Sequence, residues 1–327
     1  MDKIKIVGGN RLQGSVILSG SKNAALPILV SSLLTAEECT YERVPNLQDI
    51  EFILRVLGEL GAEIDGELDD GTVKVKCEEI DQVEAPYDLV RKMRASVLVL
   101  GPLLARFGEA KVSLPGGCAI GARPINFHLE GLKALGAQIE LQEGYVIAKC
   151  KRLKGNRVTF PFPSVGATEH LMMAASLAQG ETVLENCARE PEIVNLGETL
   201  NKMGVKLEGA GEETIRIQGR DSLNGGRFRI MADRIEAGTY LTAGFITQGK
   251  VKVEGLEPIH LEAVLKVFEK AGARISRGKE SIELEAQGLA RGTPITTEPF
   301  PGFPTDMQAQ FMALMCVAQG ESEITET

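Results

Sequence analysis

The sequence contains no tryptophan, only four tyrosines and only three histidines among its 327 residues. Proteins that bind single-stranded nucleic acids stack bases on aromatic side chains, and this chain offers few of them. Its formal net charge is −9, whereas nucleic acids and anionic membranes attract net-basic surfaces. The composition therefore argues against nucleic acid and membrane as general partners, and we expect neither.

Long uninterrupted apolar runs are also missing. The longest apolar stretches, around 26–34 and 95–105, are broken by proline or serine and fall short of the roughly 18 residues that a membrane span needs. The first seven residues alternate like a strand and contain no apolar block typical of a signal peptide. We therefore expect a cytoplasmic protein.

The six cysteines form no C-x-x-C pair and no metal-ligand spacing with histidine, which fits thiols in a reducing compartment. We expect five of them to be buried apolar residues: Cys39, Cys77, Cys150, Cys187 and Cys316. The three histidines, His128, His170 and His260, have no ligand partners at suitable spacing and are interpreted as structural. No metal or cofactor is expected.

What the chain does contain is a repeat of helix and strand, in an otherwise ordinary composition of 43% hydrophobic and 25% charged residues. The first half of each unit is an apolar, small-residue helix followed by a strand. Five copies are present, at 24–41, 95–113, 169–184, 237–253 and 308–324. The length fits two domains.

The second half of each unit is an amphipathic helix that ends at glycine and is followed by a strand. Four copies are present, at 50–64, 127–139, 193–207 and 261–275. Their closing glycines, at 61, 136, 204 and 272, are 75, 68 and 68 residues apart, so a unit has about 70 residues of α/β structure. The fifth unit stops halfway at Thr327, and we expect the chain to be part of a longer protein.

Function is expected in the connections between these units, and two segments are candidate crossings between domains. The stretch 220–229 is polar and glycine-containing and is the best candidate linker. A second crossing is expected near Ser19-Gly20-Ser21.

The most distinctive connection is Ser113-Leu114-Pro115-Gly116-Gly117-Cys118-Ala119-Ile120-Gly121-Ala122-Arg123-Pro124. Its glycines permit unusual backbone dihedrals and close approach of a ligand. A nearby cation such as Arg123 favours the thiolate of Cys118, as in nucleophilic or proton-donating cysteines. The pattern predicts a reactive loop.

This loop, with several further stretches, resembles the enolpyruvyl transferases, in the branch whose acceptor is UDP-N-acetylglucosamine. The other matching stretches are 20–24 (GSKNA), 93–96 (MRAS), 163–168 (PSVGAT), 188–193 (AREPEI), 233–236 (DRIE) and 303–310 (FPTDMQAQ). The resemblance implies a two-domain inside-out α/β barrel, each domain having three β/α units around a pseudo-threefold axis with the helices inside. Residues 22–229 would form the three-repeat domain that carries the cysteine loop. Residues 1–21 with 230–327 would form the second domain, incomplete at its C-terminus.

The resemblance also implies a reaction: the enolpyruvyl group of phosphoenolpyruvate moves to the 3-hydroxyl of UDP-N-acetylglucosamine, and phosphate is released. Lys22 and Arg123 would hold the anionic groups of phosphoenolpyruvate, and Asn23 would bind the tetrahedral adduct. Cys118 would deliver a proton to the methylene carbon and could form a covalent adduct. Asp306 would act at the sugar hydroxyl.

The implied contacts with the two substrates come from five parts of the chain. They are Lys22, Asn23, Arg94, Arg123, Pro124, Ile125, Asn126, Phe127, Ser164, Val165, Gly166 and Asp306. Asn126 and Phe162 differ from many relatives, which leaves the details of uridine contact open. The oligomeric state is also open.

Several alternatives remain. Lys22 and Arg94 could be solvated surface charges, and Asp306 could be a helix N-cap. The protein could transfer the same group to shikimate 3-phosphate, although that branch lacks the cysteine loop, or it could bind the nucleotide sugar without catalysis.

The repeat count also predicts that the 327-residue chain is inactive by itself. The apolar residues Phe311, Met312, Leu314 and Met315 would lack packing partners in a second domain with one and a half units.

Overall fold

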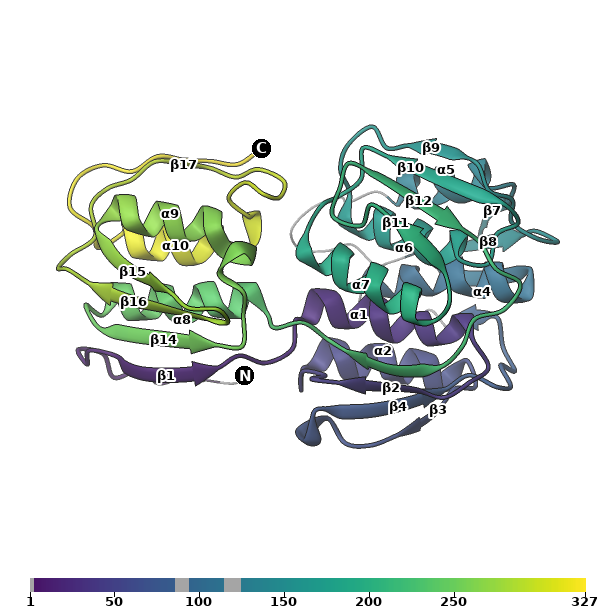
Figure 1. Cartoon of the computed structure of the whole chain (residues 1–327), viewed down its shortest axis with the longest axis horizontal. Coiled ribbons are helices and arrows are strands. Elements are labelled where there is room, and N and C mark those ends of the chain that lie inside the picture. The colour runs from purple at the N-terminus through teal and green to yellow at the C-terminus, as the bar shows by residue number, and fades with distance from the viewer. Residues whose placement is uncertain (1–2, 86–93, 115–124) are drawn as a thin grey trace. The chain divides into compact units, whose positions relative to one another are not determined.

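The computed structural model describes residues 3–85, 94–114 and 125–327, without the side chains of residues 94 and 95 (Figure 1). The chain divides into two compact units. The large unit spans Gly20–Met231, and the small unit combines Met1–Ser19 with Ala232–Thr327. The predicted linker at 220–229 is wrong in its second half, because Gly226–Arg229 is a strand, β13, inside a sheet of the large unit.

The large unit contains three four-stranded sheets of the same design. Their strands are β2 (Cys39–Glu42), β3 (Glu63–Asp65), β4 (Thr72–Lys76), β5 (Glu84–Ala85), β6 (Glu109–Ser113), β7 (Gln138–Gln142), β8 (Tyr145–Lys149), β9 (Arg157–Thr159), β10 (Glu181–Glu185), β11 (Lys206–Glu208), β12 (Thr214–Gln218) and β13. The orders are β13-β2-β4-β3, β5-β6-β8-β7 and β9-β10-β12-β11. In each sheet the first pair is parallel and the other two pairs are antiparallel.

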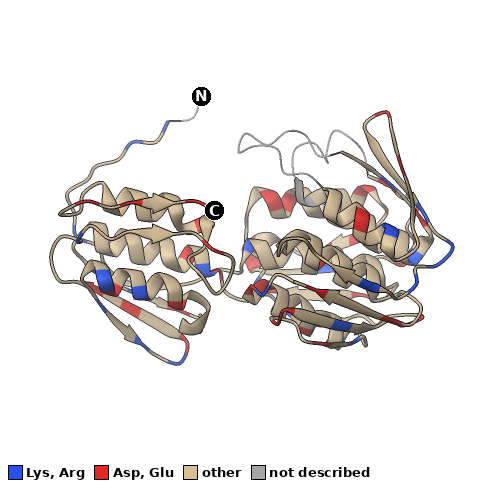
Figure 2. Cartoon of the chain, turned by 90° about the horizontal axis from the view of Figure 1, so that it is seen from above, with Lys and Arg blue, Asp and Glu red and all other residues tan. Residues whose placement is uncertain are grey.

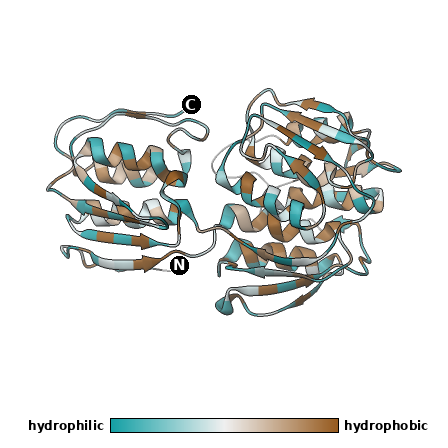
Figure 3. Cartoon of the chain, viewed as in Figure 1, coloured by the Kyte–Doolittle hydropathy of each residue, from teal (hydrophilic) through white to brown (hydrophobic). Residues whose placement is uncertain are grey.

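Each sheet accompanies two helices. The first helices are α1 (Lys22–Val30), α4 (Leu100–Phe107) and α6 (Val165–Ala175), and the second are α2 (Gln48–Glu59), α5 (Asn126–Ala134) and α7 (Pro191–Lys202). Short 3-10 turns, η1 (Ser31–Leu34), η2 (Leu68–Asp70) and η3 (Arg94–Val99), complete the unit. Residues 24–30 of α1 and 167–175 of α6 are all buried. A helix that is apolar on every side belongs in a core, and Figure 3 shows these inner helices largely brown.

The glycines that close the second helices have left-handed backbone conformations. Their φ values are +107° at Gly61, +97° at Gly136, +102° at Gly204 and +106° at Gly272. A residue with a side chain is strained at such angles, so glycine ends the helix there. The predicted helix-glycine-strand repeat is therefore confirmed in all four copies, including the one in the small unit.

The small unit has one sheet of the same design, in the order β1-β14-β16-β15, and a two-stranded parallel sheet, β17-β18. Its strands are β1 (Gln13–Ile17), β14 (Lys250–Glu254), β15 (Ala273–Arg277), β16 (Ser281–Ala286), β17 (Ile295–Thr296) and β18 (Ile324–Thr325). Its helices are α8 (Arg234–Ile246), α9 (Glu262–Ala271) and α10 (Gln308–Met315), with 3-10 turns η4 (Pro258–Leu261) and η5 (Thr305–Met307).

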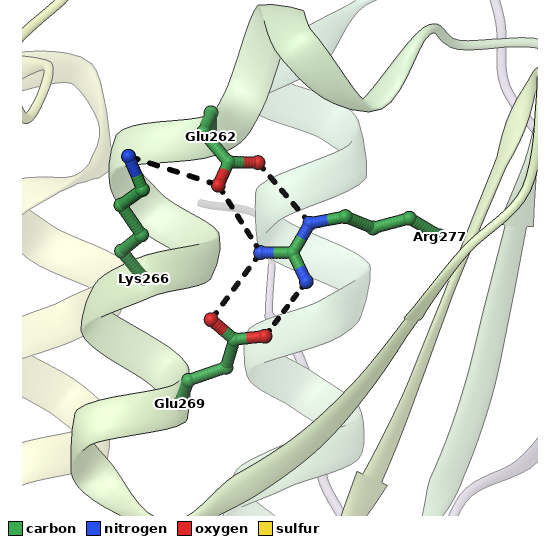
Figure 4. A network of polar contacts seen from close by, with 4 residues as sticks. All are labelled: Glu262, Lys266, Glu269 and Arg277. Atoms are coloured by element: carbon green, nitrogen blue, oxygen red, sulfur yellow. Dashed lines mark hydrogen bonds and ion pairs between the residues drawn. The ribbon is translucent and has the colours of Figure 1, made fainter.

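An ion-pair network fastens α9 to β15 (Figure 4). The guanidinium of Arg277 lies 2.7 Å from a carboxylate oxygen of Glu269 and 3.1 Å from one of Glu262. Lys266 lies 3.9 Å from Glu262 on the same helix. The hydrogen bond to Glu269 contributes most to the raised pKa of Arg277. Because one arginine serves two carboxylates, the network stabilises this surface more than a single exposed pair would.

The expectation that Phe311 and Leu314 lack packing partners is wrong, and so is the expectation that Cys316 is buried. Phe311 and Leu314 are fully buried, and the ring of Phe311 packs against Phe303 at 5.5 Å between centroids. Met312, in contrast, is 47% exposed. Cys316, the residue that follows α10, is exposed as well.

Charge of both signs is interspersed on strands and outer helices, as Figure 2 shows. Within the described part of the chain, no helix is both long enough and apolar enough to span a bilayer.

Candidate functional site

The start of α1 carries two of the predicted site residues on a firmly held backbone. Ser21 caps the helix, since its hydroxyl oxygen accepts a hydrogen bond from the amide of Ala24 at 3.3 Å. The amide of Ser21 donates to the carbonyl of Met231 at 2.8 Å. Lys22 and Asn23 follow as the first two residues of the helix, both partly exposed. Their position is therefore fixed by a buried helix while solvent reaches their side chains.

The ammonium of Lys22 forms an ion pair that the sequence analysis missed. Its Nζ atom lies 3.0 Å from Oδ2 of Asp49, in the first turn of α2. One strand, β2, separates α1 from α2 along the chain and reverses its direction, so both helices begin at the same end of the repeat. The sequence offered one signal for this pair, namely that Asp49 is an acidic residue in the first turn of the helix that follows α1.

The start of α6 carries Ser164, Val165 and Gly166. Ser164 is the N-cap, and its hydroxyl accepts from the amide of Ala167 at 3.4 Å. The helix has 11 residues, and its first-turn amides and dipole favour a negative charge at this end. The predicted diphosphate contacts thus lie at a helix end of suitable polarity.

The start of α5 lies beside the start of α6. Ile125 is buried, Asn126 is exposed and Phe127 is partly buried in the first turn of α5. The ring of His128 lies about 3.5 Å from where a side chain at Gly166 would begin. The structure therefore brings the predicted contacts at 125–127 and 164–166 together.

Two histidines have a structural role behind this pair of helix starts. The rings of His128 and His170 lie 5.0 Å apart. The Nε2 atom of His170 accepts a hydrogen bond from the amide of Gly101 at 2.7 Å, which requires the unprotonated form of that nitrogen. Burial, followed by the nearby His128, lowers the pKa of His170 well below its usual range. His170 is held neutral and joins α6 to α4.

The helix α6 also carries a buried carboxyl. Glu169 is 4% exposed, and among the described residues its Oε1 atom has no hydrogen-bond partner. Burial, and then the neighbouring Glu192 and Glu190, raise the pKa of Glu169 well above its ordinary value.

Asp306 belongs to the small unit. It lies in η5 and is exposed. The N-cap of α10 is Met307, without a side-chain hydrogen bond, so the interpretation of Asp306 as the cap of that helix is wrong.

The predicted residues Cys118, Arg123 and Pro124 lie outside the described residues, as does the side chain of Arg94. Their roles stay predictions. Three of the other thiols are unsuited to nucleophilic chemistry, because burial raises the pKa of Cys39 and Cys77 to about 11 and of Cys187 to about 12.

A cavity of about 660 Å³ in the large unit contains none of the predicted residues. It lies where η1, α4 and α6 end, and Arg106 lines it. Arg106 donates to the carbonyls of Leu33 and Thr35 at 3.1 and 2.8 Å, so its charge satisfies a helix end. Among the described residues, no group of three or more histidine, cysteine or acidic side chains could hold a metal ion.

The sequence matches a family model over residues 6–327, described as EPSP synthase (3-phosphoshikimate 1-carboxyvinyltransferase). A protein of Geotalea uraniireducens named UDP-N-acetylglucosamine 1-carboxyvinyltransferase is 54% identical over 326 residues, which are 100% of this chain and 78% of the relative. A protein of Mesorhizobium japonicum named UDP-N-acetylglucosamine 1-carboxyvinyltransferase 1 is 54% identical over 338 residues, covering 100% of this chain and 79% of the relative.

Solved structures share the fold. The enolpyruvyl transferase NikO from Streptomyces tendae superposes with a TM-score of 0.87 at 23% identity, over 98% of this chain and 76% of that protein. EPSP synthase from Acinetobacter baumannii gives a TM-score of 0.68 at 18% identity, over 87% of this chain and 67% of that protein. At these identities the likeness concerns the α/β fold alone.

Proposed function

The chain belongs to the EPSP synthase family of enolpyruvyl transferases, and we propose that it transfers the enolpyruvyl group of phosphoenolpyruvate to the 3-hydroxyl of UDP-N-acetylglucosamine. The observation that carries this proposal is the 54% identity, over the whole chain, to relatives that bear the name of this reaction. The reaction releases phosphate and is the first committed step of peptidoglycan synthesis, which takes place in the cytoplasm and serves cell shape and division.

The starts of two helices support the choice of ligands. Phosphoenolpyruvate and a nucleotide diphosphate are both anions, and a helix N-terminus with a cation is a suitable place for them. Lys22 begins α1, and Ser164 caps α6. We assign Lys22, together with Arg123, to phosphoenolpyruvate. Arg94 and the segments 123–127 and 164–166 are assigned to the nucleotide sugar.

The chemical step is an addition followed by an elimination. The sugar 3-hydroxyl oxygen bonds to C2 of phosphoenolpyruvate while the thiol of Cys118 delivers its proton to C3. Asp306 accepts the hydroxyl proton, and Asn23 binds the tetrahedral adduct. The Cys118 thiolate then takes a proton back from C3 as the C2–O bond to phosphate breaks, which restores the double bond. The proton held by Asp306 passes to the released phosphate. Cys118 could instead bond to C2 in a covalent adduct, and that thiol would be the target of an epoxide such as fosfomycin.

A second acceptor is possible, because the matching family model is described as the enzyme of shikimate 3-phosphate. The intact cysteine loop at 113–124 favours the nucleotide sugar. A non-catalytic protein that binds the nucleotide sugar is the other alternative, and retention of Lys22, Cys118 and Arg123 argues against it.

The experiment is phosphate release from phosphoenolpyruvate with either acceptor. Because the repeat count predicts that the 327-residue chain is inactive, the assay uses this chain and an extended chain, in which the rest of the Geotalea uraniireducens relative follows Thr327. Release that requires UDP-N-acetylglucosamine supports the proposal. Release with shikimate 3-phosphate alone, or nucleotide-sugar binding without release in the extended chain, contradicts it.

A further inference from the structure

We propose that Asp49 is a positioning residue that holds the ammonium of Lys22 in place for the reaction. The proposal rests on the function proposed above, in which Lys22 binds phosphoenolpyruvate. The observation behind it is the ion pair of 3.0 Å between Nζ of Lys22 and Oδ2 of Asp49.

Helix stability does not explain a lysine at this position. Lys22 is the first residue of α1, and a cation at the N-terminal end of a helix opposes the helix dipole, which costs stability. The first turn of α1 has no acidic residue that could offset this cost. Asp49, in contrast, has the sign that the start of α2 favours. The pair therefore places the unfavourable charge beside a favourable one.

Folding stability does not explain the pair either. The side chains of Lys22 and Asp49 are 42% and 41% exposed. Ion pairs with this exposure contribute little to folding stability, because water screens the attraction and both side chains lose freedom. The ion pair can still affect the reaction, because it restricts where the flexible side chain of Lys22 places its ammonium.

Both ends of the pair stand on rigid elements. In α1, residues 24–30 are buried, and in α2 the core positions include Ile50 and Ile53. The two helices pack against each other in the large unit. A lysine side chain can adopt many rotamers, and the ion pair with Asp49 restricts them before the substrate arrives. An ammonium has three N–H donors and can bridge a carboxylate and a substrate anion at once.

The carboxylate has two opposing effects on the substrate. It orients Lys22, which favours the transition state, and it also brings a negative charge near an anionic ligand, which weakens binding. Removal of the charge should therefore lower kcat while KM for phosphoenolpyruvate does not rise. A merely structural residue would not produce this combination.

The test compares Asp49→Asn with Glu51→Gln. Both substitutions remove one negative charge from the first turn of α2, but the carboxylate of Glu51 pairs with Arg55 at 3.7 Å. The variants are made in the 327-residue chain, and in the extended chain if the former has no activity. We expect Asp49→Asn to lower kcat about tenfold with KM for phosphoenolpyruvate unchanged or lower. Asp49→Glu should recover part of the loss, and Glu51→Gln should stay within twofold of the unmutated protein.

Two further measurements decide between positioning and structure. When Lys22→Gln is already present, adding Asp49→Asn should lower kcat by less than a further twofold, because Asp49 acts through Lys22. Thermal unfolding midpoints of Asp49→Asn and Glu51→Gln should agree. An unchanged kcat, an equal loss in both backgrounds, or a lower midpoint with a raised KM in Asp49→Asn alone would overturn the proposal. Absence of phosphate release in the unmutated extended chain would instead contradict the proposed function, and the positioning role with it.

Discussion

The large unit and the small unit follow one design to different extents. In the large unit the last strand, β13, pairs with the first, β2, so that the described chain forms three four-stranded sheets around buried helices. The described small unit has one such sheet, and β17-β18 repeats only its parallel first pair. Met312 of α10 and Val317 after it are 47% and 48% exposed. Within the described residues, the design therefore occurs three times in the large unit, and in the small unit once in full and once as its parallel first pair.

The largest expected effect comes from replacing one cysteine in each unit and comparing turnover. Cys118→Ala in the large unit should lower turnover about 10³-fold, because the general acid that protonates C3 is lost. Cys118→Asp should be milder, since a carboxyl can still move a proton. The control is Cys316→Ala, which removes an exposed thiol from the small unit. Steady-state phosphate release of the extended chain measures all three, and an equal loss in Cys316→Ala would contradict the assignment.

The next effect concerns the completeness of the small unit. We expect the 327-residue chain to release phosphate more than tenfold more slowly than the extended chain, because Asp306 would lack a stable support. Asp306 lies in η5, beside the partly exposed helix α10. The same phosphate assay compares the two chains at equal concentration. Activities within tenfold of each other would contradict this view of the small unit.

Two glycines sharpen the comparison of stability. A Cβ at Gly225, before β13, would lie 2.3 Å from the carbonyl oxygen of Glu38, and one at Gly292, before β17, would lie 2.2 Å from that of Glu321. We expect Gly225→Ala to destabilise the large unit by ~3 kcal/mol, the upper range for overpacking. Gly292→Ala should cost about 1 kcal/mol, because a two-stranded sheet can shift. Urea titration with hydrogen exchange of each unit measures both, and equal costs would contradict the comparison.

The smallest effect concerns pH and the large unit alone. The raised pKa of Glu169 means that above pH 4.5 the unfolded chain releases a proton that the folded chain keeps, so this residue lowers stability as pH rises above that value. His170 has the opposite sign: its lowered pKa costs stability as pH falls below 6.5. Glu169→Gln should therefore stabilise the large unit at pH 7 by ~1 kcal/mol and have less effect near pH 4.

Hydrogen exchange measures the free energy of unfolding of the large unit at the two pH values and so checks this prediction. Glu208→Gln is the control, because Glu208 is an exposed acid on β11 of the same unit. A gain in stability that is equal at pH 4 and pH 7 would contradict the sign.

The sequence predicted the elements better than their partners. Helical periodicity and the glycines at 61, 136, 204 and 272 depend on nearby residues, and the structure confirms them. The sequence at 226–229 predicts a linker and not a strand, because its partner strand, β2, lies almost 190 residues earlier. Polar exposed residues on one face of an edge strand look like a loop in the sequence.

For the candidate site, the sequence predicted the residues that belong to motifs but not their partners. Motifs identified Lys22 and the helix start at Ser164, but Asp49 belongs to no motif and follows from the reversal of the chain by β2. The burial of Phe311 could not be predicted, since it depends on Phe303 in a loop of the small unit.

The most direct measurement is the binding of UDP-N-acetylglucosamine to residues 20–231 alone. Circular dichroism first shows whether this unit is folded, and isothermal titration calorimetry then measures the binding. The account predicts saturable binding, weaker than in the extended chain, and no comparable binding of shikimate 3-phosphate. A folded large unit that binds neither ligand, or binds both equally well, would contradict it.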